Sequence, residues 1–201
     1  MAHQRDMHHF LSGRLSVGLT LAVGVAAAAA EPTDPLPEVP VVRKLPPDAR
    51  TLVTTSDEIP QEWRITTEAP AAGWEKPDFD TSGWKLVLGG IGYGDPPGSK
   101  VRSTWRSEDV WARREFSLSS AEITDLWLRI HHDEDAEVYL NGVKIAQTRR
   151  FTTAYVHLDV PKDRESALKV GRNVLAVHCH HSGGGQYIDV GLVDCPTEPH
   201  E

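Results

Sequence analysis

Hydrophobic and polar residues alternate along residues 135–146. Between positions 136 and 140 every second residue is apolar, and Glu137 and Tyr139 lie between the apolar ones. A period of two gives a β-strand one apolar and one wet face. Asn141-Gly142 follows, a pair suited to a two-residue type I′ turn because both positions need a positive φ. The alternation resumes at Val143, so the sequence predicts a β-hairpin and an antiparallel β fold.

Strand-like runs recur on both sides of this hairpin. They are rich in β-branched and aromatic residues and cover residues 51–55, 63–67, 84–88, 110–118, 125–131, 153–158, 173–179 and 187–192. Clusters of Gly, Pro, Asp and Ser separate them at intervals typical of a β-sandwich. Residues 174–177 are apolar without alternation, which indicates a central strand covered on both faces. Residues 162–170 fit one short helical turn. We therefore predict an all-β antiparallel sandwich.

The first thirty residues have the form of an export signal. Arg5 and Arg14 precede an apolar core at residues 15–25, and small alanines lead up to Glu31. An uncleaved anchor helix is the alternative, but the glycines and the alanine run make the segment weakly apolar and short. We predict a signal peptide over residues 1–30. The mature protein is then secreted or periplasmic and has no membrane association.

The rest of the chain divides by composition. Residues 31–50 are rich in proline, which prevents regular helix or sheet and predicts a semi-stiff linker. Residues 51–195 hold the strand-like runs and form the predicted sandwich. Residues 196–201 form a tail. The folded region is long enough to bury a substantial core.

Overall composition narrows the class of protein. The chain has 201 residues, 39% of them hydrophobic and 25% charged, as in an ordinary globular protein. The formal net charge is −8. A nucleic-acid surface needs clustered Lys and Arg, so the charge argues against nucleic-acid partners and against adsorption to anionic lipid. Cys179 and Cys195 are the two cysteines, and an oxidising compartment permits either a disulfide or a buried free thiol.

Several motifs follow one another in a characteristic order. They occupy residues 74–84, 89–94, 104–105, 110–116, 128–142 and 171–177. This order resembles the galactose-binding-like jelly rolls that accompany glycoside hydrolases, including the sugar-binding domain of family 2 enzymes. Residues 183–191 resemble a subgroup common in exported bacterial carbohydrate-active proteins. The resemblance implies a non-catalytic domain whose partner is a glycan ligand or a glycan-processing enzyme.

Four residues are our candidates for carbohydrate binding: Tyr93, Trp105, His132 and Asp133. Tyr93 and Trp105 fall in a Gly-, Pro- and Ser-rich loop, where a side chain has less core to fill and where binding sites are common. Aromatic faces stack on sugars, and carboxylates bind their hydroxyls. The other aromatic residues of segment 74–84 are better interpreted as core anchors beside turn-forming aspartates.

Two histidine clusters offer an alternative chemistry. Imidazoles two apart on a strand face the same way, so His178 and His180 could chelate a transition metal together. The spacing matches no standard zinc module, and we favour solvated strand ends for these histidines and for residues 131–135. We predict no metal ligands and no cofactor. A structural calcium on the acidic run is left as an alternative, although the run lacks the spacing of an EF-hand.

No pair of carboxylates is singled out by context as a glycosidase pair, and no nucleophile elbow or phosphate-binding loop is present. We therefore predict no catalytic residues. The preferred function is an exported carbohydrate-binding module accessory to glycan degradation. A structural or protein-interaction sandwich without glycan binding is the second hypothesis, and a glycoside hydrolase or metalloenzyme is the third.

Overall fold

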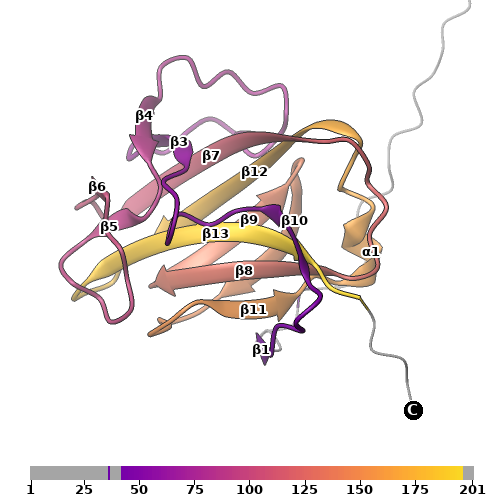
Figure 1. The fold of residues 1–201 in the computed structure, drawn as a ribbon. Helices are drawn as coiled ribbons and strands as arrows, with labels where there is room; N and C mark the ends of the chain where they lie inside the picture. The colour runs from indigo at the N-terminus through magenta and orange to yellow at the C-terminus, as the bar shows by residue number, and fades with distance from the viewer. Residues whose placement is uncertain (1–35, 37–41, 197–201) are drawn as a thin grey trace, which may run out of the picture. The chain divides into compact units, whose positions relative to one another are not determined.

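The structure is a computed structural model that describes Leu36 and residues 42–196. The predicted signal peptide, half of the predicted linker (residues 31–35 and 37–41) and most of the tail lie outside the described residues. Two β-sheets and one short helix, α1 (Lys162–Glu165), make up the described part (Figure 1). The predicted all-β sandwich is confirmed.

The sandwich pairs a seven-stranded sheet with a six-stranded sheet. The seven-stranded sheet runs β1 (Val42–Arg43), β11 (Val156–Asp159), β8 (Leu126–Asp133), β13 (Gln186–Asp194), β5 (Ile91–Tyr93) and β6 (Ser103–Thr104), and β2 (Arg50–Val53) also pairs with β13. The six-stranded sheet runs β10 (Val143–Thr148), β9 (Asp135–Leu140), β12 (Gly171–His180), β7 (Asp109–Leu118), β3 (Glu62–Thr66) and β4 (Lys85–Leu88). Neighbouring strands are antiparallel except β5 and β6.

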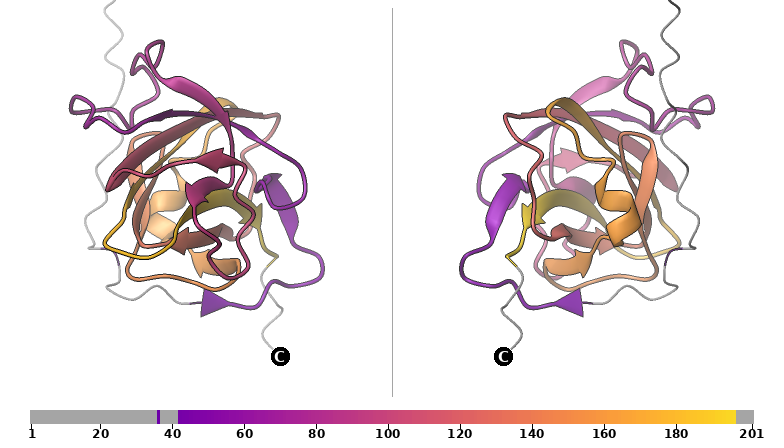
Figure 2. Two further views of the ribbon diagram at one scale, coloured as in Figure 1. Left: turned by 90° about the vertical axis from the view of Figure 1, so that its left-hand side faces the viewer. Right: turned by 90° about the vertical axis from the view of Figure 1, so that its right-hand side faces the viewer.

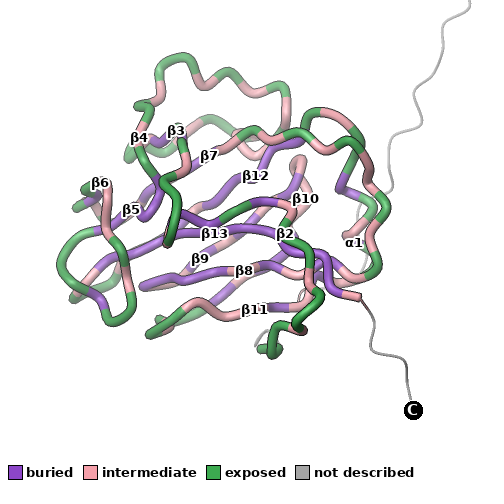
Figure 3. The backbone as a smooth tube through the Cα atoms, viewed as in Figure 1, coloured by how far each residue is buried: buried purple, intermediate pink, exposed green. Residues whose placement is uncertain are grey.

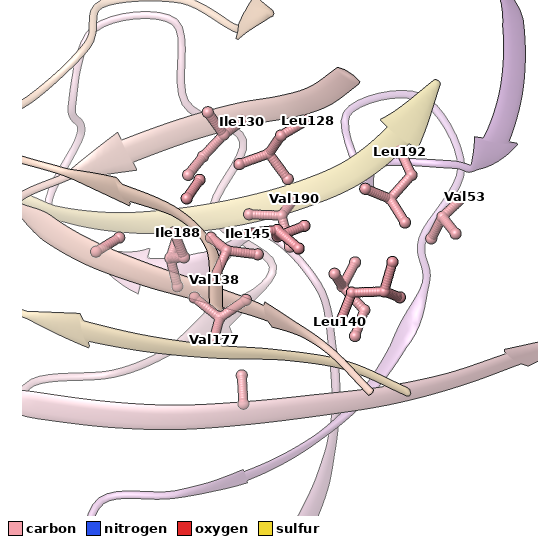
Figure 4. Packing of buried hydrophobic residues seen from close by; sticks show 14 of the residues in the cluster. Val53, Leu128, Ile130, Val138, Leu140, Ile145, Val177, Ile188, Val190 and Leu192 are labelled. Atoms are coloured by element: carbon pink, nitrogen blue, oxygen red, sulfur yellow. The ribbon is translucent and has the colours of Figure 1, made fainter. Parts of the chain in front are cut away.

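Alternate residues of both sheets point inward and form one core. Side chains such as Leu128, Ile130, Val138, Val177 and Val190 are at most 1% exposed (Figure 4). Burying a residue of this kind contributes about 1.5–3 kcal/mol. The central strands β12 and β13 are buried along most or all of their length, as the prediction for residues 174–177 requires (Figure 3).

The predicted hairpin is the connection between β9 and β10. Asn141 has φ 50° and Gly142 has φ 90°, the two positive values that a type I′ turn needs. The Asn141 side chain also donates to Ala167 O at 2.8 Å and accepts from Val174 N–H at 2.8 Å. The turn is therefore tied to the neighbouring strand β12 as well as to its own hairpin.

The strand boundaries correct two expectations. Val42–Arg43 lies in the predicted linker, yet it pairs with β11, and Arg43 binds Asp159 at 2.6 Å. The sandwich therefore begins before Thr51. The Gly-rich loop also contains the short strands β5 and β6, which the sequence pattern did not reveal because each has three residues or fewer. The long loop between β3 and β4 extends beyond the strands it joins (Figure 2).

The outer face of the seven-stranded sheet is covered. Asp189 on β13 is 3% exposed and accepts hydrogen bonds from Ser56 N–H and Tyr155 O–H, both at 2.6 Å. Arg129 on β8 forms an ion pair with Asp57 at 2.7 Å and lies over the Tyr155 ring. The segment after β2 therefore lies over the polar side chains of this sheet.

Cys179 and Cys195 are both free and buried. Burial raises the pKa of both thiols, that of Cys195 to about 12. Neither thiol is thereby prepared as a nucleophile. Among residues 42–196 and Leu36, no helix is long and apolar enough to cross a membrane.

Candidate carbohydrate-binding end of the sandwich

The strand register brings the predicted site residues to one end of the sandwich. Tyr93, the last residue of β5, lies opposite Gln186, and Asp133, the last residue of β8, lies opposite Tyr187. Trp105 follows β6, and its backbone N–H donates to Gly92 O at 3.0 Å. We call the region formed by residues 93–96, 105–108, 132–134, 150–152 and 181–185 the Tyr93 end. The sequence placed these residues far apart, and the sheet brings them together.

Trp105 corrects the prediction that it lies in a loop with little core to fill. Its side chain is 1% exposed, and Nε1 donates to Ser107 Oγ and Asp109 O, both at 3.0 Å. Its ring meets His181 edge-on, with centroids 6.4 Å apart. The short strand β6 folds the loop back onto the core, so this indole is an anchor and offers no face to a sugar.

His132 is also buried, at 3% exposure, on the inward side of β8. Its Nδ1 lies 2.7 Å from Glu134 O and 3.3 Å from Thr148 Oγ1 of the other sheet. Burial lowers its pKa, although hydrogen bonds from the imidazole to the backbone of Glu134 and Arg150 act in the opposite direction. His132 links the two sheets through Thr148. The prediction that it lies at a solvated strand end, where a glycan could reach it, is wrong.

Asp133 is nearly buried, at 9% exposure. Burial raises the pKa of its carboxyl group, and the neighbouring Glu134 raises it further. A Cβ placed on Gly185 would lie 3.3 Å from Asp133 Oδ2 and 2.8 Å from Pro96. The loop before β13 therefore packs over this carboxyl group and leaves it a narrow opening to solvent.

Tyr93 is the predicted residue that remains accessible, at 40% exposure. The Arg106 guanidinium lies 3.9 Å from the centroid of its ring, a cation–π contact. Phe151, which the sequence analysis did not select, is 59% exposed and pairs with Asp133 in an isolated bridge. The sequence signal that could have selected Phe151 is its position as an aromatic residue directly after the arginines at 149–150. Glu134 accepts a hydrogen bond from Ser182 at this end.

The interpretation of residues 131–135 as solvated strand ends is wrong for the histidines. His131 is fully buried, its Nε2 lies 3.2 Å from Thr152 O, and burial lowers its pKa. Within the described part of the chain, no group of three or more His, Cys, Asp or Glu residues is placed to hold a metal ion. The structural calcium left open by the sequence stays untested.

Segment 74–84 forms a half-buried aromatic cluster on the outer side of the six-stranded sheet. Trp74 and Trp84 stack with centroids 6.5 Å apart, and Trp74 meets Tyr139 edge-on at 5.5 Å. Asp80 accepts from Ser82 N–H at 2.8 Å, as a turn former does. The turn role predicted for Asp80 is confirmed, whereas the prediction that the aromatic residues are core anchors is wrong, because they are half-buried outside the core.

No family model matches the chain. An α-L-rhamnosidase from Streptomyces avermitilis is 27% identical over 124 residues, which are 58% of this chain and 12% of that enzyme. The chain thus spans about an eighth of the length of this curated relative.

Solved structures resemble the sandwich more fully. β-Glucuronidase 2 of Bacteroides uniformis matches with a TM-score of 0.53 and 20% identity, over 74% of this chain and 18% of that one. A β-glucuronidase from Ruminococcus gnavus matches with a TM-score of 0.53 and 14% identity, over 77% of this chain and 31% of that one. A glycoside hydrolase family 2 β-glucuronidase matches with a TM-score of 0.51 and 17% identity over 77% of this chain. The predicted resemblance to the β-sandwich of such enzymes is confirmed for the fold.

Proposed function

We propose that this chain is a non-catalytic carbohydrate-binding domain, accessory to glycan degradation and exported by its N-terminal segment. The observation that carries the proposal is the chemistry of the Tyr93 end, where the exposed rings of Tyr93 and Phe151 share one end of the sandwich with the carboxyl group of Glu134. Aromatic rings and carboxylates are the groups that bind sugar C–H faces and hydroxyls. The fold and the sequence similarity to an α-L-rhamnosidase support the same class of ligand.

Binding without hydrolysis fits this end better than catalysis. A glycosidase holds two carboxyl groups on opposite sides of the bond it cleaves, about 5–9.5 Å apart. Asp133 and Glu134 are consecutive residues at one strand end, and Glu134 is held by Ser182. Asp133 has a raised pKa, as a general acid needs, but it lies under the loop at Gly185.

A glycan panel tests the function. The full chain is titrated calorimetrically with rhamnose-, galactose-, glucose- and glucuronate-containing oligosaccharides, and release of reducing sugar is measured in parallel. We expect saturable binding to at least one oligosaccharide and no hydrolysis. Hydrolysis that disappears in Asp133→Asn would show that the domain is a glycosidase and would overturn the proposed non-catalytic role. Sequencing of the N-terminus of the exported protein tests the export proposal, for which Glu31 is the expected first residue.

A protein-interaction role is the second candidate, and one observation favours it. Leu86 and Leu88 on the edge strand β4 are 53% and 43% exposed. Exposed apolar side chains on a sheet edge invite association with another chain. If the whole panel fails to bind and the protein self-associates less as Leu86→Lys, this candidate replaces glycan binding.

A further inference from the structure

The outer face of the six-stranded sheet contains a hollow of about 260 Å³. It is lined by Asp135, Ala136, Glu137, Gln147, Thr148, Arg149, His178 and His180. These side chains come from β9, β10 and β12 and from Arg149, which directly follows β10, and we call the region the strand-face hollow. Its volume is close to the lower limit of about 300 Å³ for small-molecule sites.

The register of the sheet explains how the hollow forms. Glu137 pairs with His178 across β9 and β12, and with Gln147 across β9 and β10. Asp135 pairs with His180 in the same way. Residues two apart on a strand point to one side, so two rows of polar side chains stand on the outer face. A bulge between Lys144 and Ala146 shifts β10 by one residue and turns Gln147 to this side.

Each charge in the hollow has a partner of opposite sign or a hydrogen-bond donor. Asp135 binds Arg149 at 2.6 Å, and Glu137 binds Lys144. Arg150 N–H also donates to Asp135 at 2.8 Å. The hollow therefore holds no large unbalanced charge that would favour an ionic ligand. It presents carboxylate oxygens, a guanidinium and an amide within one small space, which suits a ligand with several hydroxyl groups.

A second layer of residues holds the two imidazoles. Asp109 Oδ1 lies 2.8 Å from His178 Nε2 and 2.9 Å from His180 Nδ1. The Trp111 ring stacks on His178, with centroids 4.7 Å apart and planes at 8°. These contacts fix the ring orientations before a ligand arrives, which reduces the entropic cost of binding.

The carboxyl groups of this region are held ionised. Burial is the largest single influence and raises the pKa of Asp135 and Glu137, but hydrogen bonds and nearby positive charges, from Arg149 and Lys144 above all, together outweigh it and leave both pKa values below normal. The same balance, with hydrogen bonds from His180 and His178, lowers the pKa of Asp109. A glycosidase needs one carboxyl group that stays protonated. These groups can accept hydrogen bonds from hydroxyls, but they are unsuited to donate a proton to a glycosidic oxygen.

We propose that the strand-face hollow binds one neutral sugar residue through its hydroxyl groups. The inference rests on the proposed glycan-binding function and adds a location and a ligand class to it. Asp135 directly follows Glu134, and His180 directly precedes the 181–185 loop, so the chain passes from the hollow into the Tyr93 end at both places.

The test compares two matched glutamates on the same outer face. Glu137 lies in the hollow, and Glu115 lies outside it in an ion pair with Arg172 at 2.6 Å. The probes are oligosaccharides of rhamnose, galactose and glucose, with D-glucuronate as the anionic arm. We expect Glu137→Gln to weaken binding of the preferred neutral oligosaccharide about tenfold or more, because a hydroxyl loses a charged acceptor. Glu115→Gln should bind as the native chain does.

Further arms separate this inference from the proposed function. Gln147→Ala, which leaves both ion pairs of the hollow intact, should also weaken binding severalfold. Equal binding by Glu137→Gln, Gln147→Ala and the native chain, with loss in Tyr93→Ala, overturns the hollow as the site and leaves the function in place. Tighter binding of glucuronate than of any neutral sugar overturns the ligand class. Failure of the native chain to bind any member of the panel overturns both proposals.

Discussion

The outer faces of the two sheets carry similar polar residues in opposite environments. On the seven-stranded sheet, His131 and Asp189 lie beneath other segments and are 0% and 3% exposed. On the six-stranded sheet, the side chains of His180 and Glu137 remain 48% and 38% exposed and line the strand-face hollow. Both sets come from strands that alternate in the same way.

The covering segment makes the difference. After β2, residues 55–57 lie over the seven-stranded sheet, where Ser56 N–H donates to Asp189 and Asp57 pairs with Arg129. Tyr155, just before β11, reaches Asp189 from the side of the next strand. Polar alternation thus identifies the face that points away from the core, whereas long-range loop packing decides whether that face meets solvent.

The largest contrast is expected when one carboxylate is removed from each face. Asp189→Ala leaves the Ser56 N–H and the Tyr155 O–H without their buried acceptor. Each orphaned donor costs about 1–3 kcal/mol, and relief of the buried carboxyl group offsets part of this, so we expect a loss of about 2 kcal/mol. Glu115→Ala should cost about 0.5 kcal/mol or less, because surface ion pairs contribute little. Urea denaturation of both variants measures the difference.

Similar losses in the two variants would contradict the assignment of one face as covered and the other as open. Asp189→Asn separates hydrogen bonding from charge, since the amide oxygen can still accept from Ser56 and Tyr155. It should retain most of the stability that Asp189→Ala loses.

Acid pH should lower the stability of the folded chain through its buried histidines. Burial lowers the pKa of His131 and of His132 below the ordinary value of about 6.5. The unfolded chain then binds more protons than the folded chain, so stability falls as the pH drops from about 6.5 through the lowered values. Burial raises the pKa of Asp133 and Asp189, and these groups act with the opposite sign, becoming less unfavourable as they protonate.

Urea titrations at pH 7.5 and pH 5.5 measure the histidine effect. The native chain should be less stable at pH 5.5, and His132→Asn should show a smaller difference between the two pH values. An unchanged pH dependence in both His132→Asn and His131→Gln would show that neither imidazole is kept neutral by burial.

Local pattern was enough to predict much of this fold. The hairpin at Asn141-Gly142, the buried run at residues 174–177 and the short helix before Gly171 all follow from turn chemistry and periodicity. The resemblance of motif order added the sandwich type. Strand β1 was missed because two residues that pair across a distance of more than a hundred positions leave no periodic signal.

The candidate site was less predictable from sequence. Tyr93 is exposed as expected, but Trp105 is buried because β6 returns the loop to the core, and no local pattern encodes that return. Glu137 and His178 were visible as outward residues of two strands. Their pairing in one hollow depends on the register between β9 and β12, which a single sequence does not display.

The histidine rings allow one measurement to test the central claim, that the open face carries the ligand site and the covered face does not. The full chain, labelled with ¹⁵N at its histidines, is titrated with the neutral oligosaccharide that binds best, and the ring resonances are followed by NMR. The account predicts saturable shifts of the His178 and His180 resonances, with the His131 resonances unchanged. A shift confined to His131, or binding without any shift of His178 and His180, would contradict it.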